Sequence, residues 1–346
     1  MIQKVLAFET SCDDTSVSIV DHSGKVWSLV SSTKDLDHEP YGGIVPEIAS
    51  RNHSSAILPL IDEAFRKSGL GWKDIQGLVV TNRPGLIGAL IVGLVTTKSL
   101  ALSKNLPFIG VNHLEGHLLA PFLHDEEHSP VFSFGEPFIA LAISGGHTTL
   151  YRVSGLGKYQ ILGTTQDDAA GEAFDKFAKM VGLGFPGGVR VDQQAKSGDP
   201  TKYQFPRSMI HDDSLNMSFS GLKSAAQRQV ASLGPTGVKA NLADLCASFQ
   251  QAVVDVLLAK LEKAADRFKI KKIVLTGGVS ANSCLRVKAQ ELAQKKKWTL
   301  SIPPLRYCTD NAAMVGLAGL LRLQAGERHD WSLGPSPQSW DGDFQK

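Results

Sequence analysis

Two histidines in the sequence are spaced so that they could bind one metal ion. His113 and His117 stand four positions apart in the segment HLEGH (residues 113–117). Residues four apart lie on one face of a helix, so both imidazole rings can reach a single ion. Imidazole is a frequent ligand of zinc, iron and nickel. Such a pair also occurs on ordinary helix surfaces, but here a predicted strand at 108–111 leads directly into it, which favours a site.

Glu115 lies between the two histidines and argues against one metal-dependent activity. In the metallopeptidase signature a glutamate directly follows the first histidine and acts as the general base. In this sequence Leu114 holds that place, and Glu115 projects about half a turn away from the histidine face. The segment therefore disfavours a metallopeptidase.

Asp310 is the candidate third ligand. It stands immediately before a predicted helix at 311–325. An aspartate at that place is also a common helix N-cap, because its carboxylate accepts bonds from the first free N–H groups. One carboxylate does not easily serve both purposes, and the sequence leaves the two roles open.

Two glycine-bearing segments have the composition of anion-binding loops. SGGHT (144–148) separates two predicted strands, and LTGGVSAN (275–282) leads from a strand into a helix. Backbone N–H groups in such loops can face a phosphate. A plain hairpin turn explains Gly145 and Gly146 equally well. The second segment lacks the Gly-Lys-Ser/Thr ending of a P-loop.

Carboxylates near these loops could bind ribose hydroxyls, as the acidic residue of a dinucleotide site does. Asp175 lies inside a predicted helix that begins near Asp167 and Asp168, and Asp192 follows the segment FPGG (185–188). Acidic residues in the first turn of a helix also stabilise its dipole without any further function. Both readings stay open for these residues.

The elements that must position these residues form a pattern that occurs twice. Strands are predicted at 5–9, 16–20, 26–30, 78–81 and 108–111, with helices at 46–67 and 86–103. After an aperiodic stretch at 124–136, strands are predicted again at 138–143, 148–153, 159–162 and 272–275, with helices at 241–268, 284–297 and 311–325. Each copy opens with a three-strand meander that has a polar first turn. We therefore expect a duplicated α/β fold with two lobes around a cleft, the first at 1–133 and the second at 134–310. The final helix, about 311–326, is expected to pack back on the first lobe.

Bulk properties disfavour several classes of protein. The 346 residues carry a formal net charge of only +2, so any contact with nucleic acid needs a local basic patch or another subunit. The four cysteines are far apart, which disfavours a disulfide framework or a cysteine zinc site. No charged leader precedes a long apolar run, and the apolar stretch at 86–102 is interrupted by glycine, threonine and lysine. We expect a cytoplasmic protein without membrane segments.

Several motifs together resemble one family. They are ETSCDDT (9–15), YGGIVPEIASR (41–51), HLEGH (113–117), SGGHT (144–148), DDAAGEAFDK (167–176), SFSGLK (218–223) and GGVSAN (277–282). In the order and spacing of these motifs, the sequence resembles the tRNA N6-adenosine threonylcarbamoyltransferases, which were formerly described as O-sialoglycoprotein endopeptidases.

The resemblance implies an actin-like, sugar-kinase-like ATPase fold of the ribonuclease H-like type. It implies transfer of a threonylcarbamoyl group from threonylcarbamoyl-AMP to N6 of adenosine 37 in tRNAs that read ANN codons, with release of AMP. It also implies one divalent metal ion on His113, His117 and Asp310, for which Fe(II) is favoured over Zn or Mg. The family's adenylate-binding positions correspond to Ala142, Ile143, Ser144, Gly145, Gly146, Asp175, Gly188, Asp192 and Asn282.

Attack by the adenine amine requires loss of a proton, and a carboxylate can accept it. Asp13 and Asp14 are the candidates for this base. Asp14 stands where many relatives have glutamate, which is one methylene longer. Arg83 stands where a glycine is common and is a candidate contact for a phosphate or a partner.

Family membership further implies tRNA as a substrate, and in bacteria an inactive paralogous subunit and a small P-loop ATPase as partners. A homodimer is the alternative assembly. Three other functions compete with the transferase: a small-molecule kinase or ATPase of the same fold, a metallopeptidase, and a non-catalytic assembly subunit. The last would be expected to lack the metal motif.

Overall fold

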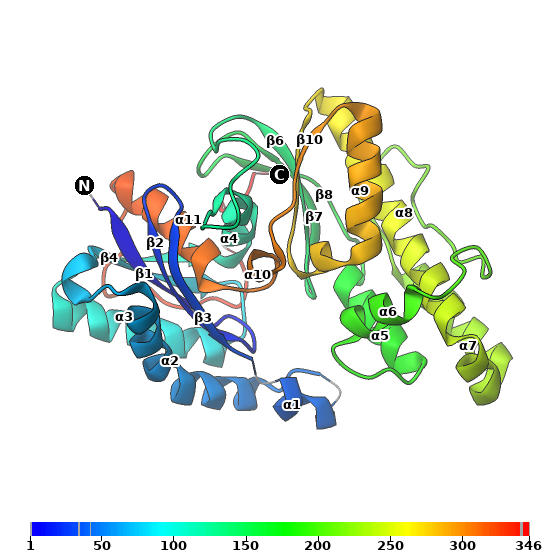
Figure 1. The fold of residues 1–346 in the computed structure, drawn as a ribbon, viewed down its shortest axis with the longest axis horizontal. Helices are drawn as coiled ribbons and strands as arrows, with labels where there is room; N and C mark the ends of the chain where they lie inside the picture. Colours follow the sequence, from blue (N-terminus) through cyan, green and yellow to red (C-terminus); the bar gives the residue numbers. More distant parts are fainter. Residues whose placement is uncertain (1, 34, 42, 340–341, 346) are drawn as a thin grey trace. The chain divides into compact units, whose positions relative to one another are not determined.

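The computed structural model describes residues 2–33, 35–41, 43–339 and 342–345. The chain forms two compact units (Figure 1). Unit 1 comprises Met1–Gly135 and Pro303–Phe344, and unit 2 comprises Glu136–Ile302 and Gln345–Lys346. Residues 303–344 thus return to the unit in which the chain begins.

Unit 1 is built on a five-stranded sheet in the order β3-β2-β1-β4-β5. The strands are β1 (Lys4–Glu9), β2 (Thr15–Asp21), β3 (Val26–Ser32), β4 (Gly77–Arg83) and β5 (Phe108–Asn112). The helices are α1 (Asp35–His38), α2 (Pro46–Ser68), α3 (Ile87–Lys104), α4 (His113–Leu119), α10 (Leu305–Cys308) and α11 (Ala312–Gln324). β1, β2 and β3 pair antiparallel, whereas β4 and β5 continue the sheet in parallel with β1.

Both faces of this sheet are covered, and β1, β2 and β4 are accordingly buried along nearly their whole length. Leu6 and Phe8 of β1 lie in the core shared with α2 and α3. The intervening residue Ala7 faces α11, where a side chain at Gly316 would approach its Cβ to 3.1 Å. This alternation follows from the two-residue repeat of a strand. Helix α11 therefore packs on unit 1, as its apolar sequence requires.

Unit 2 repeats the arrangement with the order β10-β9-β6-β7-β8. Its strands are β6 (Phe138–Ile143), β7 (Thr148–Val153), β8 (Tyr159–Thr164), β9 (Lys272–Thr276) and β10 (Thr299–Ser301). Its helices are α5 (Ala170–Met180), α6 (Gly187–Ala195), α7 (Ser220–Ala240), α8 (Leu242–Phe268) and α9 (Ser283–Lys296). Strand β10, only three residues long, was missed by the sequence pattern because no periodicity can be read over so short a run.

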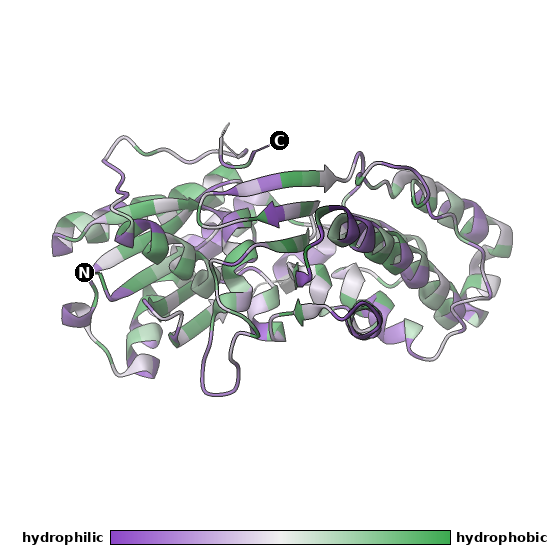
Figure 2. Ribbon diagram, turned by 90° about the horizontal axis from the view of Figure 1, so that it is seen from above, coloured by the Kyte–Doolittle hydropathy of each residue, from purple (hydrophilic) through white to green (hydrophobic). Residues whose placement is uncertain are grey.

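The two sheets have equivalent strand orders. Taken in chain order, β1 to β5 occupy the same places in the first sheet as β6 to β10 occupy in the second. Each meander is antiparallel and each continues into two parallel strands. The predicted duplicated α/β fold is confirmed. Apolar residues concentrate on the strands and packed helix faces of each unit (Figure 2).

Two helices, α3 and α8, are long and apolar enough to cross a membrane by length and composition alone. Core helices of globular proteins pass the same test. Most of α8 is buried in unit 2, and α3 packs on α2 and β4 within unit 1. Both are therefore elements of the folded units.

Candidate functional site

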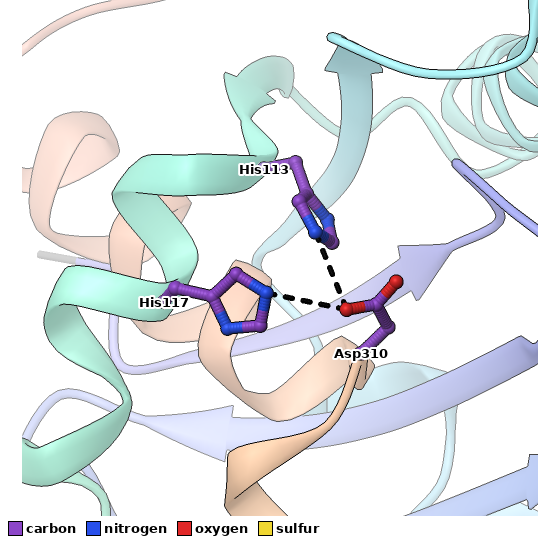
Figure 3. Close-up of side chains that lie close together, drawn as sticks. All are labelled: His113, His117 and Asp310. Atoms are coloured by element: carbon purple, nitrogen blue, oxygen red, sulfur yellow. Dashed lines mark ion pairs between the residues drawn. The ribbon is translucent and has the colours of Figure 1, made fainter. Parts of the chain in front are cut away.

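Three side chains that the sequence singled out meet in unit 1. His113 and His117 project from α4, and Asp310 approaches from the turn between α10 and α11 (Figure 3). The Oδ1 atom of Asp310 lies 3.3 Å from Nε2 of His113 and 3.2 Å from Nε2 of His117. One ligand atom from each residue can be chosen so that all lie within 4.8 Å of one another.

Local structure explains why both histidines point to the same place. Strand β5 ends at Asn112, whose side-chain oxygen accepts a hydrogen bond from the Leu114 N–H at 2.8 Å and so caps α4. One helical turn then separates His113 from His117, which places both rings on one face of the helix. The rings meet edge to face, with centroids 4.6 Å apart.

The two roles that the sequence left open for Asp310 are now separated. The N-cap of α11 is the next residue, Asn311, whose side-chain oxygen accepts from the Met314 N–H at 3.0 Å. The carboxylate of Asp310 is thereby left to face the two histidines.

The donor set fits a metal ion. Two ligand atoms that each lie about 2.1 Å from a common ion are separated by about 3.0–3.4 Å for octahedral or tetrahedral angles. The observed separations of 3.2 and 3.3 Å from Asp310 to the histidines agree with this range. His113, His117 and Asp310 are consistent with a metal site of two imidazoles and one carboxylate.

A fourth residue, Glu9, contacts His113 and was not predicted as a site residue from the sequence. Its Oε2 atom lies 2.9 Å from Nδ1 of His113 and accepts a hydrogen bond from the Thr81 hydroxyl at 2.6 Å. Its Oε1 atom accepts from the Ser11 N–H. Glu9 is fully buried at the end of β1. Its position at the end of an apolar strand could have indicated this role, because a buried carboxylate requires a partner of opposite charge or a hydrogen-bond donor.

The charges of this group are strongly coupled. Burial alone would lower the pKa of His113, but the carboxylates of Asp310 and Glu9 raise it well above its usual value. Burial would raise the pKa of Asp310, yet the histidines hold it well below its ordinary range. Burial lowers the pKa of His117. The carboxylates of Asp310 and Glu9 therefore both face His113, and Asp310 also faces His117. Their negative charges would stabilise a cation bound between Asp310 and the two histidines.

Glu115 is oriented away from the histidines, as its position on the helix predicted. Its carboxylate is buried and accepts a hydrogen bond from the Arg322 Nε–H of α11 at 2.8 Å. Since α4 and α11 pack together, this ion pair joins the two helices that carry the site. Glu115 has a structural contact in place of the general-base position of a metallopeptidase.

Asp13 and Asp14 lie in the turn between β1 and β2 and are half-buried. The same turn is tied to the candidate metal site through Ser11, whose hydroxyl lies 3.2 Å from Nδ1 of His113. The Ser11 carbonyl accepts a hydrogen bond from the Leu86 N–H at 2.8 Å, which fixes the turn against the start of α3. The two predicted bases are thus within three residues of a direct contact to His113.

In unit 2, residues Ala142 and Ile143 end β6, and Ser144, Gly145 and Gly146 form the turn into β7. The turn closes through the Ser144 N–H, which donates to the His147 carbonyl at 2.8 Å. Neither Gly145 nor Gly146 has the positive φ that would require glycine, and no heavy atom lies within 4 Å of the position where either Cβ would be. On the side where a Cβ would project, the backbone of the turn is therefore open to a ligand.

Two other glycines allow close packing around this turn. A Cβ at Gly171, in the first turn of α5, would lie 2.5 Å from the Ser144 carbonyl oxygen. A Cβ at Gly277, after β9, would lie 2.5 Å from the Ile143 carbonyl oxygen. The start of α5 and the glycine segment after β9 thus both abut the Ser144 turn.

The remaining predicted ligand-binding residues of unit 2 already bind backbone or side-chain groups. Asp175 accepts from the Gly187 N–H at 2.8 Å, which holds the start of α6 beside Gly188. Asp192 accepts from the Ser283 hydroxyl at 2.7 Å. These contacts fix the segments that carry the residues.

Asn282 has two structural contacts of its own. It caps α9 by accepting from the Leu285 N–H at 3.0 Å, and its amide donates to Gln250 at 2.7 Å. No local sequence pattern indicated Gln250 as its partner, because the two residues are 32 positions apart.

Arg83 contacts the C-terminal segment of its own unit. Its guanidinium donates to Asp343 from Nε at 2.7 Å and from a terminal nitrogen at 2.5 Å. The sequence offered a phosphate or a partner as the contact of this charge, and the structure provides an internal carboxylate.

Comparison with known proteins agrees with the motifs. Residues 25–317 match the family model described as tRNA N6-adenosine threonylcarbamoyltransferase. The chain is 67% identical over 345 residues to the protein of that name from Bdellovibrio bacteriovorus, with 100% of both chains covered. It is 48% identical over 336 residues to the one from Anaeromyxobacter dehalogenans, covering 96% of this chain and 98% of that protein.

Solved structures with little sequence similarity share the fold. HypF from T. kodakarensis matches with a TM-score of 0.60 at 13% identity, over 94% of this chain and 48% of that one. Component A of the (R)-2-hydroxyglutaryl-CoA dehydratase from Acidaminococcus fermentans matches with a TM-score of 0.53 at 14% identity, over 94% and 100%. These likenesses confirm the actin-like fold class. The sequence relationships go further, and on them the chain belongs to the tRNA N6-adenosine threonylcarbamoyltransferase family.

Proposed function

We propose that His113, His117 and Asp310 bind one divalent metal ion, and that the ion is Fe(II). The enzyme transfers a threonylcarbamoyl group to N6 of a tRNA adenosine to form t6A. Two histidines and one carboxylate that leave other positions open are typical of non-haem Fe(II) sites, and Zn also suits this set. The single observation that carries the proposal is the convergence of both imidazoles on Asp310.

When bound, such an ion can orient the donor and polarise one of its oxygen atoms. The chain's own residues hold it in place. Glu9 accepts the hydrogen bond from the far nitrogen of His113, which fixes the orientation of that ring and increases its basicity. Arg322 binds Glu115 and so keeps a competing carboxylate away from the histidines.

We propose that the donor is threonylcarbamoyl-AMP and that unit 2 binds its adenylate part. The turn formed by Ala142, Ile143, Ser144, Gly145 and Gly146 would place backbone N–H groups against the phosphate. The open backbone at both glycines supports this role, because the turn itself does not require glycine there. Asp175, Gly188, Asp192 and Asn282 would bind the nucleoside.

We propose that Asp13 or Asp14 accepts the proton that the amine loses. The N6 nitrogen forms a bond to the carbamoyl carbon, the bond from that carbon to the phosphate oxygen breaks, and AMP leaves with the electron pair. An adenine amine is a weak nucleophile, so positioning and proton removal must supply much of the rate. The tie from Ser11 to His113 supports a place for both carboxylates beside the metal ligands.

For partners, we propose an inactive paralogous subunit and a small P-loop ATPase, in the cytoplasm, with a homodimer as the alternative. One surface of unit 1 supports a protein partner. Helix α3 exposes Ile87, Ile91, Val95 and Leu102, at 48%, 45%, 56% and 73% of their surface. The spacing of the first three places them along one helix face, and contiguous apolar stripes of this kind mark interaction surfaces.

The test is a transfer assay with purified protein, threonylcarbamoyl-AMP and tRNA, with and without the candidate partners, together with metal analysis. Wild type should retain about one equivalent of metal and form t6A, whereas His113→Ala should lose both. His22→Ala is the matched control, since His22 is exposed on the turn between β2 and β3. Metal-free protein with full transfer activity would refute the metal site, and ATP-dependent phosphorylation of a small metabolite would favour the kinase alternative.

A further inference from the structure

The segment after α11 packs along strand β5, which is the edge of the unit 1 sheet. The His329 N–H donates to the Phe108 carbonyl at 3.3 Å, and the His329 ring accepts from the Gly110 N–H at 3.2 Å. Leu333 is buried in the core beneath this segment. The C-terminal segment, which the structure describes at residues 325–339 and 342–344, therefore covers an edge strand that would otherwise expose unpaired backbone groups.

Further along, the C-terminal segment reaches the ends of β4 and β5. The Ser336 N–H donates to the Asn82 carbonyl at 2.9 Å. Asp343 then forms the bidentate ion pair with Arg83. Both side chains are nearly buried, since Arg83 is 9% exposed and Asp343 is 10% exposed. Removing one partner of such a buried ion pair destabilises the fold, because the remaining charge is left without a partner and without solvent.

The same carboxylate contacts the residue that precedes the first metal ligand. The Asn112 amide nitrogen donates to Asp343 Oδ2 at 2.9 Å and to the Ser339 hydroxyl at 2.9 Å. With its nitrogen held by two acceptors, the amide must direct its oxygen the other way, where it caps α4 at the Leu114 N–H. His113 lies between Asn112 and Leu114 in the chain.

We propose that Asp343 and Arg83 act as positioning residues for the metal site. Their ion pair fixes the amide of Asn112, and Asn112 fixes the first turn of α4, which orients the His113 ring. The inference rests on the proposed metal site and adds the C-terminal segment as its support. It also gives a function to the buried charge of Arg83.

The experiment measures Co²⁺ binding to the full, metal-stripped chain by its visible absorption, and amide hydrogen exchange of residues 112–119 by mass spectrometry. Loss of an outer-shell partner weakens metal affinity by about 10–100-fold. Asp343→Ala should therefore weaken Co²⁺ binding about tenfold and should speed exchange at the start of α4. Asp255→Ala is the control, because Asp255 of unit 2 also accepts two hydrogen bonds from one arginine, Arg207, and none of the proposed metal ligands belongs to unit 2.

A charge swap separates positioning from simple stabilisation. Arg83→Asp with Asp343→Arg restores the ion pair and should restore thermal stability, but arginine offers no acceptor to Asn112. The swapped protein should therefore keep the weakened Co²⁺ affinity. Asp343→Asn, which retains an acceptor oxygen, should show a smaller loss of affinity, and it replaces the alanine variant if that variant does not fold.

Three outcomes overturn the inference. Unchanged affinity and unchanged exchange in Asp343→Ala would show that the C-terminal segment does not position α4. Full recovery of affinity in the charge swap would exclude the route through Asn112. Both results leave the proposed metal site intact. If wild type binds no Co²⁺, or if His113→Ala binds it equally well, the proposed metal site itself is wrong and the inference is lost with it.

Discussion

Glu9 and His113 form a buried pair in which the Oε2 atom of Glu9 lies 2.9 Å from the Nδ1 atom of the imidazole. The other ring nitrogen of His113 is directed at Asp310, 3.3 Å away. Metal sites often contain a carboxylate, a histidine and the metal ion in this order, because the carboxylate fixes the tautomer of the ligating histidine. Strand β1 thus contributes to the site although none of its residues was predicted to.

The first prediction concerns this pair. Glu9→Gln keeps the size of the side chain but removes the charge that makes His113 a better ligand, so metal affinity should fall about 10–100-fold. Co²⁺ titration of the metal-stripped protein measures it. Thr81→Val serves as the control, because it removes one bond to Glu9 and leaves the carboxylate facing His113. Equal affinity in Glu9→Gln and wild type would exclude a contribution from Glu9.

The second prediction separates a ligand from a helix cap at two adjacent residues. Asp310→Asn should abolish metal retention and leave α11 capped, since the cap is Asn311. Asn311→Ala should lower the free energy of unfolding by about 1 kcal/mol and retain the metal. Metal analysis and urea unfolding of both variants provide the measurement. The reverse pattern would show that the carboxylate caps the helix.

The third prediction tests the Ser144 turn. Gly145→Ala should not lower the free energy of unfolding, because the position is free of backbone strain and no other part of the chain lies within 4 Å of the added methyl group. If the adenylate phosphate approaches this backbone, the methyl group should weaken binding of a non-hydrolysable adenylate analogue at least tenfold.

Calorimetry of analogue binding and urea unfolding measure the two effects at Gly145. Gly71→Ala, at another open position, is the control and should lower neither the affinity for the analogue nor the free energy of unfolding. A Gly145→Ala protein that binds the analogue as tightly as wild type would place the phosphate elsewhere.

The fourth prediction concerns pH. Burial would raise the pKa of Asp125, but hydrogen bonds from Arg306 and Tyr307 hold it well below its ordinary 3.8. Because the folded-state pKa is lowered, the stabilisation is fully present above the unfolded value and is lost as the pH falls through the folded one. Asp125→Asn should therefore be less stable than wild type by about 1 kcal/mol at pH 7, a figure that allows for the partial exposure of Arg306.

The stability difference at Asp125 should narrow as the pH falls below 4. Urea unfolding of both proteins at pH 7, 4 and 3 measures it. A difference that stayed constant over this range would show that the charge of Asp125 does not stabilise the fold.

The fifth prediction concerns the apolar stripe on α3. Val95→Glu places a charge at the middle of the exposed face, where it should prevent association with the paralogous subunit while the monomer stays folded. Analytical ultracentrifugation of mixtures gives the association constant, and circular dichroism reports folding. Val189→Glu is a matched control, because Val189 is equally exposed but lies on α6 in unit 2. Undiminished association of the Val95→Glu protein would remove this face from the interface.

The sequence by itself determined the repeated three-strand meander, because period-two apolar runs and polar turns are local signals that do not depend on distant residues. It also determined the histidine pair, since a spacing of four fixes two side chains on one helix face. The family followed from motifs spread between residues 9 and 282.

Only the tertiary structure decided which distant residues complete the site. Asp310 and Asn311 are adjacent and both suit a helix start, and their roles separated only when α11 was packed against α4. Glu9 contacts His113, which is 104 positions away in the sequence. Asp343 contacts Arg83, which is 260 positions away. Such pairs leave no local pattern, because a buried charge takes its partner from whatever the fold brings near it.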